Sequence, residues 1–455
     1  MNIFIFHRDF RLIDNTTLLK IKNSVPIFIF TPEQIDNNSY FSSNSFQFMI
    51  ESLYELEKLI KKKSGELYFF KGDNIKVLDS ILQNNKINSI SYNIDYTPYA
   101  RKRDLAINTW AQDNNIQICC EEDYPLHNIM EGETKNQTSD NAYLVFTPFK
   151  KHCEKLQVRK PSKYNKFTFQ KIDFKDNKYK ILLDHFKYIE NENINVRGGR
   201  KNGLKILKNI IKWKDYAKER DYLSYKTTYL SSHNHFGTVS IREVYNKLLG
   251  NDMLINELYW RDFYINITYY YPKILEGQIG KKNKSLKEKY DTIKWSTKHF
   301  DSWCNGQTGF PIIDAAMNQL NITGYMHNRC RMIVASFLTK DLLLDWRLGE
   351  KYFATKLVDY DPMSNSGGWQ WSASVGADSQ PYFRIFNPFS QQKKFDKDCK
   401  YIKNWLPILE SVPAKDIHLW DITCKKYIKD GIKYYEPIID HSIQRKKALK
   451  LFSDI

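Results

Sequence analysis

The segment NSGGWQWSASVGAD at residues 365–378 places an amide, two tryptophans and two adjacent glycines side by side. Gly367 and Gly368 permit backbone conformations that are closed to other residues, and they let a ligand approach the main chain in a turn. Trp369 and Trp371 offer flat apolar surface next to them. The segment therefore predicts a site for a large flat ligand, and the alternative is a pair of ordinary core aromatics.

Two helical segments carry further residues that are suited to ligand chemistry. Thr227, Thr228 and Ser231 precede a helix that we expect to begin near residue 239, where hydroxyls suit phosphate oxygens but also act as ordinary caps. Glu257 and Trp260 stand three residues apart on one helical face, and Arg261 follows Glu257 by one turn. A carboxylate beside an indole can recognise a base-like ring, although an ordinary amphipathic helix also explains the pattern.

A third helical segment contains an arginine among apolar neighbours. Asn328 and Met332 share a face at i, i+4 spacing, and Arg331 stands beside them in MHNRCRMIVASF. A buried arginine needs an anionic partner. Asp359 and Asp361, in the following loop, are the candidates.

The predicted secondary structure that positions these residues changes along the chain from alternating strands and helices to helices alone. Short apolar stretches alternate with amphipathic ones in the first part, which predicts a parallel sheet covered by helices on both faces. A polar, lysine-rich stretch follows, and helical periodicity then dominates to the end. The predicted strands are 2–6, 25–30, 66–70 and 89–93, and the predicted helices between them are 45–63, 74–85 and 100–115. We expect an α/β domain over 1–125, an interdomain connector over 126–195 and an all-α domain over 196–455.

Length and composition bound the class of protein. A chain of 455 residues exceeds the usual size of one hydrophobic core. It contains no apolar run long enough to span a membrane, and MNIFIFHRDFRL reads as a buried strand and not as a signal peptide. We expect a soluble intracellular protein, cytoplasmic or nuclear depending on the host. Its seven cysteines show no Cys-x-x-Cys spacing, which predicts a reducing compartment and no metal site.

The balance of charge indicates the kind of partner. A net charge of +17 makes a polyanion plausible, although many of the lysines could be solvated surface. The 30 tyrosines, 27 phenylalanines and 10 tryptophans fit either base stacking or a large aromatic core.

Taken together, these segments resemble the photolyase/cryptochrome family over essentially the whole chain. The match is carried by FHRDFRLIDNTTL near the N-terminus, VFTPFKKH at 145–152, WCNGQTGFPIIDAAMNQLNITGYMHNR at 303–329 and GGWQWSASVGADSQPYFRIFNPFSQQKKFD at 367–396. The resemblance implies a Rossmann-like α/β antenna domain followed by a helical FAD-binding domain. The predicted flat ligand is then FAD.

The resemblance also implies roles for individual residues around the flavin. Arg331 and Asp359 match the family's ion pair over the isoalloxazine ring, Asp361 its hydrogen-bond partner, and Asn365 the side chain facing flavin N5. Trp369, Trp346 and Trp295 match the tryptophan chain that brings electrons to photoexcited oxidised flavin. The adenine-nucleotide and diphosphate contacts are matched by Tyr216, Thr227, Thr228, Leu230 and Ser231.

A second implied set lines the DNA-binding pocket, which receives a pyrimidine dimer flipped out of UV-damaged DNA. Glu257 would hydrogen-bond the dimer, and two indoles would pack against its rings. The dimer pocket is matched by Glu257, Trp260, Asn328, Met332 and Trp371. We expect DNA contacts also from Arg220, Arg261 and Arg329, and phosphate contacts from Lys281, Lys282 and Lys284.

Within the family the chain is most like class I cyclobutane pyrimidine dimer photolyases. The (6-4) photolyases and animal cryptochromes carry a His-His pair where this chain has His327 and Asn328, and plant cryptochromes replace Asn365 by aspartate and Trp371 by tyrosine. The sequence also ends soon after its last helical stretch, so we expect no signalling tail. The expected activity is that of a carbon–carbon lyase, in which light-excited FADH⁻ lends an electron to the dimer and recovers it.

The alternatives are a cryptochrome-type photoreceptor and a (6-4) photolyase. We expect a monomer that binds DNA and no membrane. Members that bind folate have an Asn-Glu pair where this chain has Tyr99 and Ala100. A deazaflavin antenna, or none, is therefore favoured over methenyltetrahydrofolate.

Overall fold

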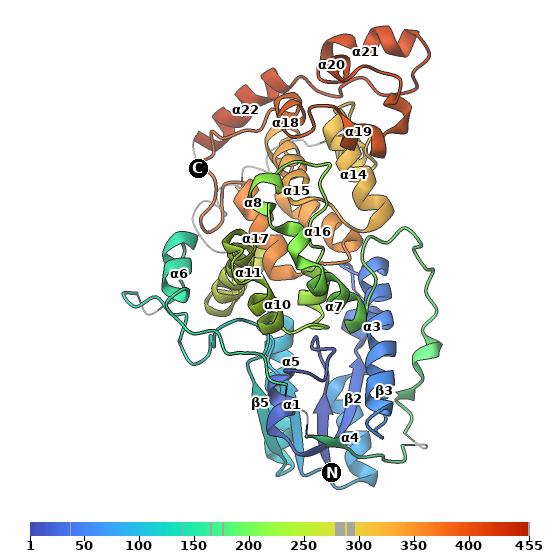
Figure 1. Cartoon of the computed structure of the whole chain (residues 1–455), viewed down its shortest axis with the longest axis vertical. Helices are drawn as coiled ribbons and strands as arrows, with labels where there is room; N and C mark the ends of the chain where they lie inside the picture. The colour runs from blue at the N-terminus through green and yellow to red at the C-terminus, as the bar shows by residue number, and fades with distance from the viewer. Residues whose placement is uncertain are drawn as a thin grey trace. The chain divides into compact units, whose positions relative to one another are not determined.

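The computed structural model describes residues 1–36, 38–139, 141–163, 166–174, 177–277, 287–288 and 296–453 (Figure 1). The chain divides into two compact units. Unit 1 comprises Met1–Asn191, Val196–Lys212 and Tyr229–Pro272, and unit 2 comprises Glu192–Asn195, Trp213–Thr228 and Lys273–Ile455. No helix in the described ranges is long and apolar enough to cross a membrane.

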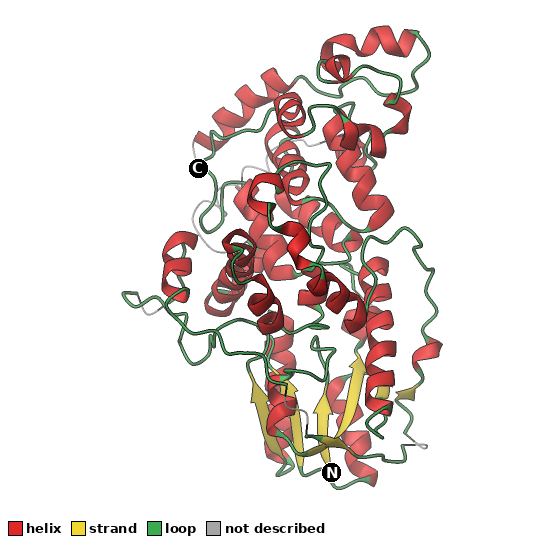
Figure 2. Ribbon diagram, viewed as in Figure 1, coloured by secondary structure: helices red, strands yellow, loops and turns green. Residues whose placement is uncertain are grey.

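A twisted sheet forms the centre of unit 1 (Figure 2). Its strands are ordered β5-β4-β1-β2-β3-β7, and β6 pairs with β2; among the described strands, only β7 runs antiparallel to its neighbour. β2 is buried along almost its whole length because helices cover both faces, which explains the apolar run at residues 25–30. The strands are β1 (Asn2–Ile5), β2 (Asn23–Phe30), β3 (Tyr68–Lys71), β4 (Ser89–Asn93), β5 (Gln117–Glu121), β6 (Thr168–Phe169) and β7 (Lys180–Ile181).

Several helices of unit 1 begin at a residue whose side chain caps the first turn. Asp73 and Thr97, for example, each accept a backbone N–H of the first turn of the helix that follows. The helices that lie wholly in this unit are α1 (Thr16–Lys20), α2 (Pro32–Ile35), α3 (Ser43–Lys61), α4 (Asn74–Asn84), α5 (Pro98–Asp113), α6 (Phe146–Cys153), α7 (Arg200–Lys208), α9 (Ser231–His235), α10 (Ile241–Leu248) and α11 (Asp252–Tyr270). The α/β class of this part of the chain is confirmed.

Two boundaries differ from those expected. The stretch 126–195 is not merely a connector, because α6, β6 and β7 lie within it and both strands join the sheet. Helices α10 and α11 group with the sheet and not with the other helices. The reason is a buried ion network: Arg242 of α10 pairs with Asp14 and Asp123, each at 2.7 Å. A long-range contact of this kind leaves no local signature in the sequence.

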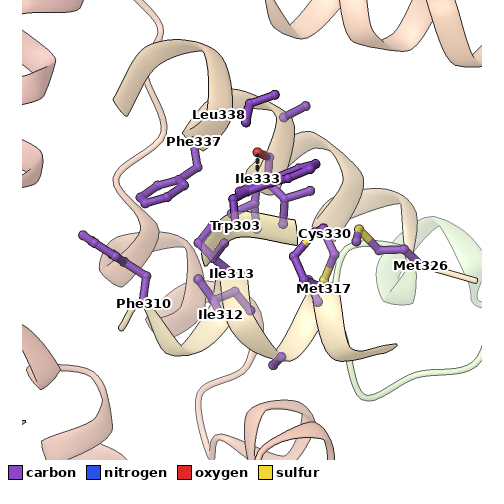
Figure 3. Packing of buried hydrophobic residues seen from close by; sticks show 14 of the residues in the cluster. Trp303, Phe310, Ile312, Ile313, Met317, Met326, Cys330, Ile333, Phe337 and Leu338 are labelled. Atoms are coloured by element: carbon purple, nitrogen blue, oxygen red, sulfur yellow. Dashed lines mark hydrogen bonds between the residues drawn. The ribbon is translucent and has the colours of Figure 1, made fainter. Parts of the chain in front are cut away.

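Unit 2 is helical, and its core cluster draws residues from helices between α13 and α22. Figure 3 shows the part of this core that α13, α14, α15 and the residues beside them contribute. Trp303 lies at the centre of this core, with its side chain fully buried and its Nε1 donating to the carbonyl of Val334. The helices are α8 (Tyr216–Glu219), α13 (Thr297–Cys304), α14 (Pro311–Thr323), α15 (Asn328–Ser336), α16 (Trp346–Lys356), α17 (Pro362–Ser372), α18 (Pro388–Phe395), α19 (Lys400–Trp405), α20 (Ala414–Ile417), α21 (Trp420–Lys429) and α22 (His441–Ser453).

The sequence predicted a turn at Gly367 and Gly368, and this prediction is wrong. Gly367 and Gly368 lie inside α17 and do not form a turn. The helix starts earlier because Asp361 caps it and Pro362 occupies its first position. The missing side chains therefore provide space beside a helix rather than an unusual backbone conformation.

Candidate functional site

An ion pair joins α15 to the segment that precedes α17. One terminal nitrogen of Arg331 lies 3.0 and 3.1 Å from the two carboxylate oxygens of Asp359, and its Nε donates to the carbonyl of Met326 at 2.9 Å. The Asp359 side chain is 4% exposed and that of Arg331 26% exposed. Of the two aspartates considered from the sequence, Asp359 is thus the partner of Arg331.

Asp361 instead sets the start of α17. Its carboxylate accepts the backbone N–H of Ser364 at 2.9 Å, which satisfies one of the free donors at the helix end. Asn365 follows Asp361 by one turn and Trp369 follows by two, so the cap positions all three on one helical face.

Asn365 lies against a buried carboxyl group of the neighbouring helix. Its Nδ2 donates to Glu350 Oε1 at 2.9 Å and to the backbone carbonyl of Glu350 at 3.1 Å. Glu350 belongs to α16, which packs directly on α17.

The residues on this face of α17 fit a flavin. A Cβ placed on Gly368 would meet no atom within 4 Å, so the helix borders open space one turn beyond Asn365. A polar amide, an apolar gap and a nearby arginine–aspartate pair suit a flat heterocycle with hydrogen-bonding edges. The family-derived assignment of FAD to this face is therefore compatible with the residues present.

Trp369 is packed on several sides. It is 3% exposed, and its ring centroid lies 5.0 Å from that of Phe353 and 6.0 Å from that of Trp303, both edge-to-face. Gly349 of α16 lies against the same indole, because a Cβ at Gly349 would fall 2.1 Å from Trp369 Cη2.

Replacing Gly349 by alanine should therefore displace Trp369. The added methyl group cannot be accommodated between the backbone of α16 and a ring held on its other sides, and overpacking of this kind costs about 1–3 kcal/mol. We expect a lower melting temperature and altered Trp369 fluorescence. Gly250→Ala, where a Cβ would meet no atom within 4 Å but φ is positive, provides a control for backbone strain alone. An unchanged melting temperature together with unchanged tryptophan emission in Gly349→Ala would contradict the packing described.

Of the other two tryptophans in the predicted electron-transfer chain, Trp346 lies within the described residues. Trp346 begins α16, is 1% exposed, and its Nε1 has no hydrogen-bond partner among the described residues. The guanidinium of Arg347 lies 4.9 Å from the ring centroid of Trp346. Trp295 lies outside the described residues, as do Lys281, Lys282 and Lys284.

The start of α15 carries the residues predicted to meet a substrate. Asn328 Nδ2 lies 4.0 Å from Met332 Sδ, which confirms that the two share a face. His327 caps the helix: its Nδ1 accepts the backbone N–H of Arg329 at 3.1 Å. Burial, with Arg329 and Arg331 nearby, lowers the pKa of His327 to about 4.

This shift predicts a pH-dependent contribution to stability. The folded-state pKa lies below the usual 6.5, so the contribution is complete above pH 6.5 and is lost as the pH falls toward 4. In His327→Asn, which keeps a capping side chain but cannot take up the proton, the loss over this window should be smaller by up to about 1.4 kcal/mol per pH unit. Urea unfolding of both proteins at several pH values measures this, with His299→Asn as the control. Parallel curves for His327→Asn and the parent would show that the pKa of His327 is the same in the folded and the unfolded protein, which would contradict the shift.

The two arginines predicted to hold DNA in unit 2 already have protein partners. Arg329 pairs with Asp221 at 2.7 Å, and its guanidinium lies 4.5 Å from the ring centroid of Phe395. The guanidinium of Arg220 lies 5.9 Å from the ring centroid of Tyr216. Both side chains are held in place by these contacts, which would orient them for a phosphate.

The predicted nucleotide contacts are divided between the units. Tyr216, Thr227 and Thr228 belong to unit 2, where the hydroxyl groups of Thr227 and Tyr325 lie 3.0 Å apart. Leu230 and Ser231 belong to unit 1, at the beginning of α9. The helix that follows the hydroxyl cluster is thus the short α9, and α10 begins only at Ile241.

In unit 1, Glu257 and Trp260 lie on α11, as the spacing predicted. The indole of Trp260 stacks on Phe146 of α6, with ring centroids 3.7 Å apart and planes at 5°. Phe146 belongs to the VFTPFKKH segment. One face of the Trp260 indole is therefore supported by the protein.

Arg261, like Arg329, already has protein partners. Its side chain is 12% exposed, pairs with Asp262 at 2.7 Å, donates to the carbonyl of Tyr124 and lies over the Tyr124 ring at 3.7 Å. These contacts engage both terminal nitrogens and one face of the guanidinium. Arg261 thus holds α11 to Tyr124 in unit 1, and its contact with DNA stays a prediction.

Three residues of the site were not identified from the sequence, namely Glu350, Gly349 and Phe146. Each acts through a partner on another helix: Asn365, Trp369 and Trp260, respectively. The only local signal was the presence of Phe146 within the segment VFTPFKKH.

The chain is similar to several known proteins over nearly its whole length. A family model described as DNA photolyase matches residues 2–165, and one described as the FAD binding domain of DNA photolyase matches residues 253–454. A deoxyribodipyrimidine photo-lyase from Alkalihalophilus pseudofirmus is 35% identical over 98% of this chain and 96% of its own length, and one from Escherichia coli is 31% identical over 98% and 97%. The crystal structure of an archaeal photolyase from Sulfolobus tokodaii with two FAD molecules superposes with a TM-score of 0.86, at 38% identity, over the whole of both chains.

Proposed function

Since this chain belongs to the DNA photolyase family, we propose that it splits cyclobutane pyrimidine dimers in UV-damaged DNA under light, with the residues described above in the following roles. The observation that carries the proposal is similarity over nearly the full length to several deoxyribodipyrimidine photo-lyases, at identities of 35% and 31%. The FAD-binding domain supplies the cofactor site.

When bound, fully reduced FAD supplies the electron that light delivers to the dimer. Arg331 and Asp359 hold the ring, and Asn365 hydrogen-bonds its polar edge. Trp369 and Trp346 would serve as electron donors to the oxidised cofactor. The Nε1–H of Trp346 has no hydrogen-bond partner among the described residues.

The lesion contacts come from side chains on well-packed helices. Glu257 and Trp260 of α11 contribute a carboxyl group and a supported indole, and Asn328, Met332 and Trp371 contribute the remaining contacts. Arg220 and Arg329 bind the flanking phosphates. These phosphate contacts position the strand without reading its sequence.

A second chromophore would bind in unit 1. From β1 the chain adds β2 and β3 on one side of the sheet and then adds β4 and β5 on the other side of β1. In open α/β sheets, ligands usually bind at the carboxyl ends of the two neighbouring strands where this change of side occurs, here β1 and β4. His7, which follows β1, has a buried Nε2 without a partner among the described residues. Tyr99, which replaces the folate-binding motif, donates to or accepts from the Thr31 hydroxyl at 2.7 Å. A deazaflavin or no antenna remains our prediction.

Two measurements test the proposal. The purified protein should show the absorption spectrum of bound flavin, and reduced protein under blue or near-UV light should remove dimers from irradiated oligothymidine. A matched oligonucleotide with a (6-4) photoproduct should not be repaired. Flavin photoreduction without loss of either lesion would favour the photoreceptor alternative, and repair of the (6-4) lesion would overturn the assignment of the dimer pocket.

A further inference from the structure

Two tyrosines are exposed on the loop that follows α8 in unit 2. Tyr222 is 46% exposed and Tyr225 is 50% exposed, and their ring centroids lie 6.2 Å apart with the planes at 72°. Two neighbouring aromatic rings at the surface are typical of a contact surface, because each combines a large apolar area with a polar hydroxyl group. This tyrosine pair has no role among those assigned above.

The core of unit 2 fixes the loop that carries the tyrosine pair. Leu223, between the two tyrosines, is 5% exposed within that core, and its N–H donates to the carbonyl of Phe395 at 3.1 Å. The N–H of Tyr225 donates to the carbonyl of Tyr222 at 3.2 Å and closes a turn. The loop is therefore ordered before any partner binds, so that less conformational entropy is lost on binding.

Cations lie next to the tyrosine pair. The ring centroid of Phe395 lies 6.5 Å from that of Tyr222. The same Phe395 ring is contacted by the guanidinium of Arg329, at 4.5 Å from its centroid, and by the Nζ of Lys394, at 5.1 Å. Aromatic rings beside positive charge suit a nucleic-acid strand, because its bases stack on the rings and its phosphates attract the cations.

The tyrosine pair also lies close to the site proposed for the lesion. Besides burial, the charges of Asp221, Arg329 and Arg220 act on the pKa of the histidine that caps α15, so these side chains lie near the start of that helix. Arg220 and Asp221 directly precede Tyr222. Asn328, which we assign to the dimer pocket, is the first residue of α15. The pair is thus placed beside the pocket and not within it.

The neighbours of a flipped dimer need such a surface. Two adjacent bases leave the duplex together, so the base on each side of them loses one of its stacking partners. An aromatic side chain can replace the lost partner whatever the sequence, because every base has a flat face.

We propose that Tyr222 and Tyr225 bind a base next to the flipped dimer by stacking, while Arg220 and Arg329 hold the adjoining phosphates. The ligand of the tyrosine pair is therefore an unpaired or half-stacked nucleotide of the strand that carries the lesion. This inference rests on the proposed function, since it takes the two arginines to bind that strand.

The test compares the parent with the double variant Tyr222→Ala, Tyr225→Ala on three oligonucleotides. One contains a cyclobutane dimer in intact DNA, and the other two carry in addition an abasic nucleotide on the 5′ or on the 3′ side of the dimer. On the intact oligonucleotide the double variant should bind about tenfold more weakly than the parent. On one of the two abasic oligonucleotides the parent and the variant should bind equally, because the phosphates remain but the base that stacks is gone.

Three further variants define the contact. Tyr222→Phe with Tyr225→Phe keeps both rings and should bind like the parent. Tyr435→Ala is the control and should also bind like the parent, because Tyr435 is likewise an exposed tyrosine of unit 2, 44% exposed and packed against Tyr434. If the double alanine variant does not fold, Tyr225→Ala alone is measured in the same way.

Three results would overturn the inference. An equal loss on all three oligonucleotides would show that the tyrosines contact the DNA backbone and not a base. Parent-like affinity of the alanine variant for the intact oligonucleotide would show that they do not contact DNA, and an equal loss in the phenylalanine variant would assign the contact to their hydroxyl groups. A parent protein that binds damaged and undamaged DNA with the same affinity would instead overturn the proposed function itself.

Discussion

Photoreduction of oxidised flavin should slow at least about 100-fold in Trp369→Phe, because an added barrier of only about 2.7 kcal/mol has this effect and phenylalanine is far harder to oxidise than tryptophan. Trp369 is buried on α17, two turns after the capping Asp361. Dimer repair by protein reduced chemically beforehand should be nearly unchanged, since that reaction does not use the tryptophan. Flavin absorbance under illumination measures the first quantity, and dimer loss measures the second.

The control for this substitution is Trp420→Phe. Trp420 is also fully buried in unit 2, and its Nε1 donates to the carbonyl of Tyr435, so its replacement tests the general effect of losing a core indole. Equal photoreduction in Trp369→Phe and in the parent would remove Trp369 from the electron chain. Trp346→Phe should slow photoreduction in the same direction as Trp369→Phe.

Affinity for dimer-containing DNA should fall about 10- to 100-fold in Trp260→Ala, since stacking on a base contributes about 1–3 kcal/mol. The indole is held by Phe146 at 3.7 Å, so the free protein presents it already oriented. Flavin content and affinity for undamaged DNA should barely change. Binding titrations with damaged and undamaged oligonucleotides of the same sequence give both values.

Two further variants define what the indole contributes. Trp260→Phe keeps a flat ring against Phe146 and should lose less affinity than Trp260→Ala. Glu257→Ala, on the same helix, should reduce repair yield per photon more than binding, because a hydrogen bond to the dimer matters most once the dimer carries the extra electron. A parallel loss of affinity for both DNAs in Trp260→Ala would show that the indole supports α11 and does not meet the lesion.

Much of this protein follows from its sequence. The parallel sheet could be predicted because strands covered on both faces are mostly apolar, as residues 25–30 of β2 are. The shared face of Asn365 and Trp369 follows from their spacing on a helix, and so does that of Glu257 and Trp260. Such features involve residues within one or two helical turns of each other. At that separation the repeat of the helix alone determines which side chains share a face.

Tertiary structure decided the partners. Asp359 and not Asp361 pairs with Arg331, because Asp361 is engaged in capping α17. Arg261 is engaged by Asp262 and Tyr124. Such pairings depend on how separate helices pack and on where each side chain points, and neither is encoded in the local period of the sequence.

The same physical reason explains the residues that the sequence did not reveal. Glu350 precedes Asn365 by fifteen positions on a different helix, and Phe146 lies more than a hundred positions before Trp260. Neither the residue type nor the neighbours of Glu350 and Phe146 in the sequence indicate which residues they contact. Only the packing of α16 on α17, and of α6 on α11, places a carboxylate at the amide and an aromatic ring under the indole.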